Sequence, residues 1–329
     1  MADIASPRIF FFTPKSDCMT ATLDVIIVNW NAGQPLRECV LSIGSAEESG
    51  FDLTRVVVVD NGSTDGSLDA MHNPGLPLTV IHNPENRGFA AACNQGAKGS
   101  KADYLLFLNP DTRLFRETLS KPIHFMEQPE NAQVGICGVR LVDDFGITTI
   151  SCARFPSVKI FFGKMTGLSR ILPRVFPSHV MSSGECLHSS TVDQVIGAFF
   201  LVRKSLCNSL GGFDERFFVY FEEVDFSLRA KRKGFSSYYL SDVLLYHKGG
   251  GSSEKAKAKR LFYSLRSRVQ YGFKHFSLPE ALALLMLTLT LELMARMSLA
   301  IFSLSMSRFN ETIRGYSQLI VYLLAKGWK

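Results

Sequence analysis

The sequence predicts an α/β protein built on a mostly parallel central sheet, and three observations lead to this prediction. Short apolar runs rich in β-branched residues recur at residues 23–29, 55–60 and 104–108. Segments with a helical pattern separate them, and strands that alternate with helices form right-handed βαβ units around a parallel sheet. The chain has 329 residues, of which 46% are hydrophobic and 20% charged, so it can bury a large core and is neither disordered nor collagenous.

The first half of the chain supplies the parallel part of the sheet. Residues 23–29 (LDVIIVN) form the first strand, because a short continuous apolar run closed by Asn31 and Gly33 is typical of a strand buried on both faces. The elements expected next are a helix at 35–45, a strand at 55–60, a helix from Thr64 or Asp65 through Met71, a strand at 78–82, a helix at 90–98 and a strand at 104–108.

The second half has a weaker pattern. Strands are expected at 134–142 and 193–202, on either side of residues 157–190, whose Pro, Gly and Ser residues indicate a long substrate loop. A turn at 211–215 leads into a charged helix at 222–233, which ends before Gly234. Residues 236–245 form a last strand that ends at His247.

Polar side chains follow three of the predicted parallel strands at their carboxyl ends. They are Asn29 and Asn31, Asp60 and Asn61, and Asn109 and Asp111. Ligands of open α/β sheets bind at this edge. Ordinary turn chemistry explains any one of these positions, but it explains three in succession less well. We therefore expect a ligand site here.

The cysteines and the N-terminus indicate a reducing compartment. Seven cysteines are an odd number, they are widely scattered, and none forms a Cys-x-x-Cys pair, which argues against a disulfide framework and a cysteine zinc site. Residues 1–19 lack an apolar run long enough for a signal peptide, so we expect an N-terminal extension without an export signal.

Two enzyme classes that contain this kind of sheet are disfavoured. A nicotinamide-dependent dehydrogenase needs Gly-x-Gly-x-x-Gly after the first strand, where VNWNAGQPL supplies only Gly33. A nucleotidyltransferase that makes activated sugars needs a basic, glycine-rich signature near its start, which is also missing.

Six segments in order resemble the family 2 inverting glycosyltransferases with the GT-A fold, and within them most closely the bacterial rhamnosyltransferases. They are VIIVNWN, VVVVDNGSTDGS, NPENRGFAAACNQG, LLFLNPDT, GGFDERFFVYFEEVDFSLRAKRKG and YHKGGGSS, between residues 23 and 253. The resemblance implies a glycosyltransferase domain at 20–253, with a nucleotide-sugar half at 20–112 and an acceptor half at 113–253.

The resemblance also implies how the nucleotide sugar is bound. Asp60 matches the family aspartate that accepts a hydrogen bond from the nucleotide base, and Asn86, Gly88 and Asn94 match the loop that lets the backbone approach the nucleotide. Asn29, Asn31, Asn61 and Asn109 complete the expected binding set. As plain turn or strand-end residues, these positions need no ligand to explain them.

Asn109-Pro110-Asp111 stands where the family has its Asp-x-Asp metal motif, with an amide in place of the first carboxylate. Mg²⁺ or Mn²⁺ prefers oxygen ligands and completes its shell with diphosphate and water, so one protein carboxylate is sufficient. The resemblance implies Asp111 as a metal ligand. It implies His247 as a further ligand or a diphosphate contact.

The family places its catalytic base in an acidic pair at the start of the acceptor-side helix. Here the pair is Glu222-Glu223, and Glu223 matches the family's aspartate one methylene longer. We take Glu223 as the base and Asp225 as the reserve candidate. Acidic residues are also common in the first turn of any helix, because the macrodipole favours them there.

The resemblance thus implies transfer of a sugar, L-rhamnose from a dTDP-rhamnose-like donor, with inversion. The acceptor is a glycan or lipid-linked glycan in cell-surface polysaccharide synthesis. Two alternatives stay open: a family 2 transferase of another nucleotide sugar, and a catalytically silent homologue that binds a nucleotide sugar. The departures at Asn109 and Glu223 motivate the second alternative. No nucleic-acid partner is expected.

The C-terminal region, 254–329, is expected to be helical and to associate with an anionic membrane surface. Residues 255–274 carry seven basic residues and no acid, and residues 281–305 contain 11 Leu, Ile or Phe but also Glu292 and Arg296. The two charges about cancel the gain from spanning a bilayer, so we expect a helix at the inner face of the cytoplasmic membrane. The alternative is a helix packed on the protein's own domain.

Overall fold

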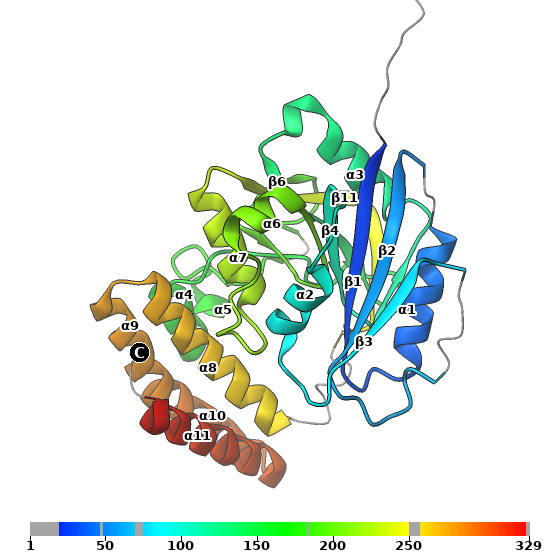
Figure 1. Cartoon of the computed structure of the whole chain (residues 1–329). Coiled ribbons are helices and arrows are strands. Elements are labelled where there is room, and N and C mark those ends of the chain that lie inside the picture. Colours follow the sequence, from blue (N-terminus) through cyan, green and yellow to red (C-terminus); the bar gives the residue numbers. More distant parts are fainter. Residues whose placement is uncertain (1–19, 47–48, 70–74, 183, 250–256, 327–329) are drawn as a thin grey trace, which may run out of the picture.

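The computed structural model of the chain describes residues 20–46, 49–69, 75–182, 184–249 and 257–326. Figure 1 shows a central sheet with helices on both faces and a set of C-terminal helices beside it. The predicted fold class, α/β with a mostly parallel sheet and a C-terminal helical part, is confirmed. The predicted N-terminal extension, residues 1–19, lies outside the described residues.

The described residues form a nine-stranded sheet in the order β3-β2-β1-β4-β10-β6-β11-β5, with β8 paired to β11. The strands at one side are parallel: β1 (Ala21–Asn29), β2 (Phe51–Asp60), β3 (Leu78–His82) and β4 (Tyr104–Leu108). β6 (Val134–Val142) and β11 (Ser236–His247) continue this direction. Antiparallel to their neighbours are β10 (Phe199–Arg203), β5 (Thr112–Leu114) and β8 (Ser190–Val192).

The register of this sheet brings the predicted polar positions to one edge. Asn29 pairs with Asp60 across β1 and β2, and Ile27 pairs with Leu108 across β1 and β4. The carboxyl ends of these three strands therefore lie side by side.

Both faces of the sheet are buried, as the apolar runs predict. On β1, Val25 and Ile27 pack into one cluster that includes residues of α1 (Gln34–Ser45) and α3 (Ser120–Glu127). Ile26 and Val28 pack into a second cluster with residues of α2 (Phe89–Ala97), α6 (Lys204–Leu210) and α7 (Glu222–Arg232). The six described cysteines have free thiols and are buried.

Three predicted elements are wrong. Residues 64–69, the described part of the helix that was expected from Thr64 or Asp65 through Met71, form a bend and a turn, because Gly66 takes a positive φ of 70°. The predicted strand 193–202 is divided into β9 (Gln194–Val195), which pairs with β7 (Cys152–Ala153), and β10. The predicted substrate loop 157–190 contains α4 (Val158–Thr166) and α5 (Leu168–Ile171).

Helix α4 has local signals that explain it. The Ser157 hydroxyl accepts a hydrogen bond from Ile160 N at 3.2 Å and caps the first turn. Gly167, with a φ of 76°, ends the helix in the left-handed conformation.

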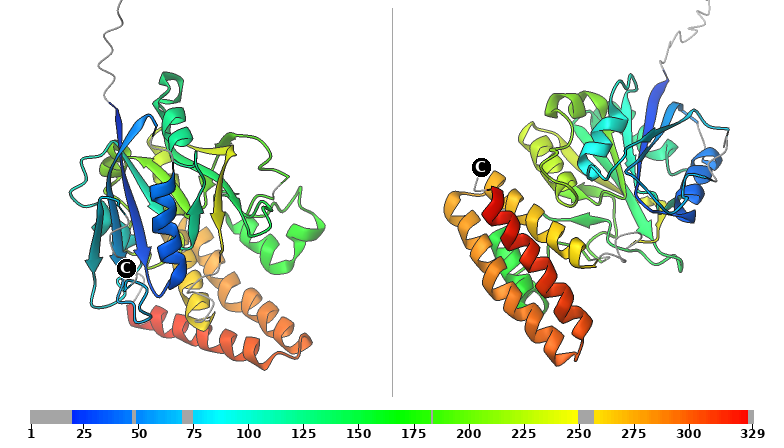
Figure 2. Two further views of the ribbon diagram at one scale, coloured as in Figure 1. Left: turned by 90° about the vertical axis from the view of Figure 1, so that its right-hand side faces the viewer. Right: turned by 60° about the horizontal axis from the view of Figure 1, so that its bottom comes forward.

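The C-terminal region forms helices α8 (Lys257–His275), α9 (Leu278–Leu287), α10 (Leu293–Phe302) and α11 (Met306–Lys326), with a π-helical turn at Thr288–Glu292. The predicted helix 281–305 ends instead at Phe302, because Leu304 has a positive φ of 47°. Lys255, the first of the predicted basic residues, lies outside the described residues. Figures 1 and 2 show α8 between the sheet domain and the other C-terminal helices.

Candidate functional site

The ends of β1 and β2 are joined by side-chain hydrogen bonds. Nδ2 of the buried Asn29 lies within hydrogen-bond distance of Asp60 Oδ1 (2.8 Å), Ser67 Oγ (2.8 Å) and Ser63 Oγ (3.0 Å). Ser63 N donates to the other Asp60 oxygen at 3.2 Å, and Thr64 N donates to Asn31 Oδ1 at 2.8 Å. These bonds fix Asp60 and the loop 61–67 at the predicted ligand edge.

A second group of amides follows β2 and β3. Asn61 Nδ2 donates to the carbonyl of Gly88 at 3.1 Å and lies 3.4 Å from Asn86 Oδ1, which also accepts from Gly88 N at 2.9 Å. Gly88 has a positive φ of 91°, and a Cβ there would lie 2.6 Å from the carbonyl oxygen of Phe218. Only glycine allows this approach.

Asn94 has different hydrogen-bond partners from the other residues that were predicted to bind the nucleotide. Its amide accepts a hydrogen bond from Phe213 N at 2.9 Å and donates to the carbonyl of the same residue at 2.9 Å. Asn94 Nδ2 also lies 3.0 Å from Glu215 Oε1. It therefore joins α2 to the loop that precedes α7.

Asn109, Asp111 and His247 come together at the ends of β4 and β11. Nε2 of His247 lies 3.4 Å from Asp111 Oδ1 and 3.4 Å from Asn109 Nδ2. The backbone also joins them, since Lys248 N donates to the carbonyl of Asp111 at 3.1 Å. The side chains of Asp111 and His247 are only slightly exposed.

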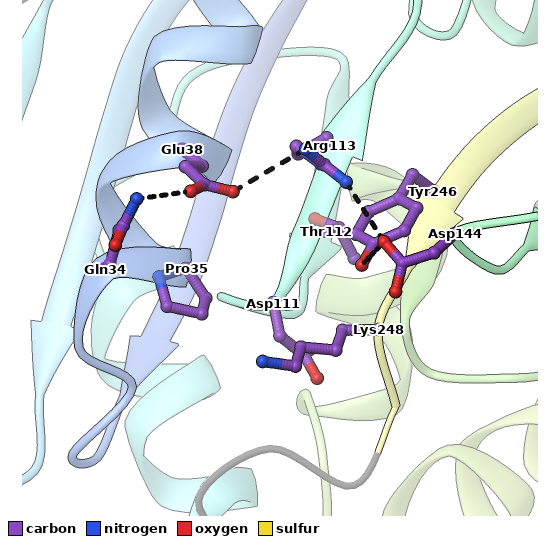
Figure 3. Close-up of a pocket in the computed structure, with 9 residues that line it drawn as sticks. All are labelled: Gln34, Pro35, Glu38, Asp111, Thr112, Arg113, Asp144, Tyr246 and Lys248. Atoms are coloured by element: carbon purple, nitrogen blue, oxygen red, sulfur yellow. Dashed lines mark hydrogen bonds and ion pairs between the residues drawn. The ribbon is translucent and has the colours of Figure 1, made fainter.

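Asp111 lines a cavity of about 280 Å³ between α1, β5 and β11 (Figure 3). Arg113 lies over the Tyr246 ring at 3.9 Å and pairs with Glu38 and Asp144 across the cavity. The other lining residues are Gln34, Pro35, Thr112 and Lys248. None of these other lining residues is among the predicted site residues, although Lys248 lies within the YHKGGGSS segment.

The residues around Asp111 suit a hard divalent cation that also binds a ligand. Among the described residues, no three His, Cys, Asp or Glu side chains converge to form a complete metal cage. One carboxylate and one imidazole do lie together beside a cavity. Mg²⁺ and Mn²⁺ accept such an incomplete protein shell when substrate phosphates and water supply the remaining ligands.

The first turn of α7 presents Glu222 and Glu223. Within the described part of the chain, the Oε2 atom of each is shielded from solvent and has no hydrogen-bond partner. Burial raises the pKa of Glu223, and backbone N–H groups of the helix N-terminus offset this only in part. Burial and the neighbouring Glu223 charge hold the pKa of Glu222 well above its ordinary value.

Backbone contacts bring Glu223 toward the end of β4. A Cβ at Gly197 would lie 3.7 Å from the Glu223 side chain, so this glycine lies directly against it. The next residue, Ala198, accepts a hydrogen bond from Asn109 N at 3.0 Å. The segment between β9 and β10 thus connects the Glu223 side chain with the Asn109-Pro110-Asp111 segment.

Asp225 differs from Glu223 in its surroundings. Its buried carboxylate accepts hydrogen bonds from Arg229 Nε at 2.7 Å and from His275 Nε2 at 2.7 Å, and it pairs with Lys274. Burial alone would raise the pKa of Asp225, but these hydrogen bonds and charges lower it below its ordinary value. Because three donors hold it, this carboxylate is a poor proton acceptor. Its contacts with Lys274 and His275 connect α7 with α8.

This open, mostly parallel sheet with helices on both faces is a GT-A fold, and amides, a carboxylate–imidazole pair and the Glu223 carboxylate lie near the ends of its strands. The model of glycosyl transferase family 2 matches residues 24–181, and that of glycosyl transferase family group 2 matches residues 104–325. The chain belongs to the family 2 glycosyltransferases.

Its relatives include bacterial rhamnosyltransferases. The chain is 26% identical over 259 residues to N-acetylglucosaminyl-diphospho-decaprenol L-rhamnosyltransferase of Mycobacterium tuberculosis (strain CDC 1551 / Oshkosh), covering 74% of this chain and 81% of the relative. It is 28% identical over 172 residues to rhamnosyltransferase WbbL of Escherichia coli (strain K12), covering 51% of this chain and 61% of that protein.

A solved structure has the same fold. The mannosyltransferase PcManGT from Pyrobaculum calidifontis, in complex with GDP-Man and Mn²⁺, aligns with a TM-score of 0.50 and 18% identity, over 93% of this chain and 87% of that one. At this identity the likeness concerns the fold alone.

Proposed function

We propose that the protein transfers L-rhamnose, with inversion, from a dTDP-rhamnose-like donor to a glycan acceptor linked to a lipid diphosphate, in the synthesis of a cell-surface polysaccharide. The names of the relatives support the sugar and the acceptor class. The observation that carries the proposal is the position of the Glu223 carboxylate, which lies against Gly197 near the end of β4 and has one oxygen shielded from solvent without a hydrogen-bond partner.

Glu223 is the general base of this reaction. Its carboxylate takes the proton of the acceptor hydroxyl as that oxygen forms a bond to the anomeric carbon. The bond from the anomeric carbon to the diphosphate oxygen breaks on the opposite face, and the nucleoside diphosphate leaves with the electron pair. One displacement inverts the configuration. The raised pKa of Glu223 suits it to accept a proton and later release it to solvent.

Asp111 and His247 would hold Mg²⁺ or Mn²⁺. When bound, the ion neutralises the developing charge of the leaving diphosphate. Asp60 accepts from the N–H of the nucleotide base, with its orientation fixed by Asn29. Asn61, Asn86 and Gly88 shape the backbone loop beside the nucleotide.

A screen of nucleotide sugars by thermal shift, with and without Mn²⁺, tests the donor. A donor that binds the folded state raises the apparent stability in proportion to the logarithm of its concentration over Kd. We expect the largest metal-dependent shift with dTDP-rhamnose. A larger shift with another nucleotide sugar would identify that sugar as the donor in place of dTDP-rhamnose. A shift without turnover of any acceptor would favour a catalytically silent homologue.

We also propose that the C-terminal helices lie on the inner face of the cytoplasmic membrane. Within the described residues, Leu278–Phe302 is one helix that is long and apolar enough to cross a membrane by length and composition, and only 28% of its most apolar stretch is buried. A core helix of similar composition would be mostly buried, so this helix presents apolar surface outward.

The orientation of this helix supports the surface proposal. Glu292, at mid-helix, faces inward and accepts hydrogen bonds from Arg268 of α8 at 2.6 Å and from Arg296 at 2.8 Å, whereas Glu280 in the first turn of α9 is exposed. Exposed apolar residues on these helices and in the turn between α10 and α11 are Leu278, Leu282, Met286, Met294, Leu299, Ile301, Phe302, Leu304, Met306, Ile313, Ile320, Val321 and Leu324. The mid-helix acid thus faces the protein while much apolar surface faces outward, and such a surface suits the headgroup region of a bilayer.

A further inference from the structure

The segment that carries Glu223 into α7 is held in a strained conformation. Tyr220 and Phe221, the two residues before the helix, have positive φ angles of 68° and 70°. Residues with a side chain rarely adopt this region, and they remain in it only when the surrounding structure holds them there. The contacts that hold this segment therefore also set the position of Glu223.

One face of α8 supplies much of this support. The Tyr263 ring stacks on Phe218 with centroids 4.6 Å apart, and Ser267 Oγ donates to the carbonyl of Val219 at 2.8 Å. Tyr271 packs against Phe221 with ring centroids 5.4 Å apart. Tyr263, Ser267 and Tyr271 are spaced four residues apart, so they lie on one stripe of the helix.

The end of the same stripe binds acidic residues on both sides of the strained segment. Lys274 Nζ donates to Asp214 Oδ2 at 2.6 Å and pairs with Asp225, and His275 Nε2 lies 2.7 Å from Asp225 Oδ1. Asp214 precedes the strained residues and Asp225 follows Glu223 by two positions. Lys274 and His275 therefore connect both ends of the segment to one helix.

The hydrogen bonds of His275 show which ring nitrogen carries the hydrogen. Its Nδ1 lies 3.0 Å from the Arg232 guanidinium, which can only donate, so Nδ1 accepts. Nε2 then carries the hydrogen and donates to Asp225. His275 is buried, and its ring also packs on Tyr271 at 4.7 Å, so the imidazole has one fixed orientation.

We infer that Lys274 and His275 are positioning residues for Glu223, and that α8 is a part of the active site rather than of a removable C-terminal appendage. They act through Asp214 and Asp225, whose carboxylates they bind. The inference rests on the proposed role of Glu223 as base, and it assigns a second role to a helix that also carries the surface helices α9–α11.

The test compares His275→Ala with His275→Gln and with Gln270→Ala. Glutamine can place its amide N–H near the position of Nε2 and so keep the donor to Asp225. Gln270, on another side of the same helix, donates to Tyr322 of α11 at 3.1 Å and is the matched control. Turnover is measured with dTDP-rhamnose, Mn²⁺ and an N-acetylglucosaminyl-diphospho-polyprenol acceptor.

We expect His275→Ala to lower kcat by about 10- to 100-fold with the donor KM within about twofold, because a small displacement of a reacting group costs rate rather than donor binding. His275→Gln should recover most of the rate, and Gln270→Ala should stay within about twofold of the wild type. Equal losses in His275→Ala and Gln270→Ala, or a normal kcat in His275→Ala, would overturn the inference.

Hydrogen–deuterium exchange separates this inference from the proposed function. In the absence of substrates, His275→Ala should speed amide exchange in residues 211–225, and Gln270→Ala should not. If the wild type failed to turn over dTDP-rhamnose while this difference was present, the proposed donor would be wrong and the support by α8 would stand. Unchanged exchange in His275→Ala would overturn the inference with any donor.

Discussion

The carboxylate of Asp111 lies 3.4 Å from Nε2 of His247, although the two residues are far apart in the sequence. β5, which follows Asp111, pairs antiparallel with the end of β11, and this pairing brings them together. A carboxylate and an imidazole in this arrangement can hold a cation with room for a diphosphate.

We predict that Asp111→Asn removes the Mn²⁺-dependent part of dTDP-rhamnose binding. Removing a hydrogen-bond partner of a metal ligand already lowers metal affinity by about 10- to 100-fold, so removing the ligand itself should lower it at least as much. Calorimetric titration with and without Mn²⁺ measures it. Asp144→Asn is the control, because Asp144 lines the same cavity but binds Tyr246 and Arg113. Full activity of Asp111→Asn in the presence of a chelator would remove the metal assignment.

Glu223→Gln should lower kcat by about 10²- to 10⁴-fold and leave donor affinity nearly unchanged, because the base acts only on the acceptor hydroxyl. Asp225→Asn should lower thermal stability, since Asp225 holds Arg229, Lys274 and His275, and should lower kcat only by the about 10- to 100-fold expected from loss of the positioning contacts. Steady-state kinetics and thermal unfolding of both variants decide this. Near-normal turnover of Glu223→Gln together with an inactive, folded Asp225→Asn would assign the base to Asp225.

The raised pKa of Glu223 predicts the acid side of the pH–rate profile. A protonated carboxyl cannot accept a proton, so kcat/KM should fall as the pH drops through a value above the ordinary glutamate pKa of 4.5. The residual rate of Glu223→Gln should lack this step. A wild-type profile that stays flat down to pH 4.5 would contradict the assignment.

The raised pKa of Glu222 predicts that the stability of the protein depends on pH. Its pKa is raised in the folded state, so above pH 4.5 the unfolded chain releases this proton while the folded chain keeps it, and the free energy of unfolding falls as the pH rises. Glutamine does not titrate. Glu222→Gln should therefore gain stability relative to the wild type on going from pH 5 to pH 8, as measured by denaturant unfolding. A gain independent of pH would show that the Glu222 pKa is not raised.

The C-terminal surface predicts salt-sensitive binding to anionic liposomes. Phe302 and Leu304 at the turn between α10 and α11 are 86% and 93% exposed, and replacing both by Asp should abolish flotation. Phe145, which is 87% exposed on the catalytic domain, supplies the control Phe145→Asp. If neither the full-length wild type nor the variants float at low salt, the membrane proposal fails.

The parallel half of the fold was predictable because its signals are local. Strands β1, β2 and β4 each contain an uninterrupted apolar run, and both faces of β1 are buried as such a run implies. Helix α4 was missed although Ser157 and Gly167 are ordinary capping residues. β5 has three residues at the end of the sheet and offers no periodicity to detect.

The positions of the candidate site residues were predictable only where these residues belong to sequence motifs. Asp60, Asn109 and Asp111 follow strands, so their gathering at one edge follows from sheet geometry. The contacts of Asp225 with Lys274 and His275 join two helices far apart in sequence, and no spacing in either helix indicates them. Asn94 was expected at the nucleotide, whereas its hydrogen bonds go to Phe213 and Glu215.

The most direct test of the central claim is the anomeric configuration of the product. The wild type is incubated with dTDP-L-rhamnose, Mn²⁺ and N-acetylglucosaminyl-diphospho-polyprenol, and the product is examined by NMR. We expect one rhamnose per acceptor, with the configuration opposite to that of the donor, and about 10²- to 10⁴-fold slower formation by Glu223→Gln. A product that retains the donor configuration, or donor binding without transfer to any glycan acceptor, would contradict a single displacement assisted by Glu223.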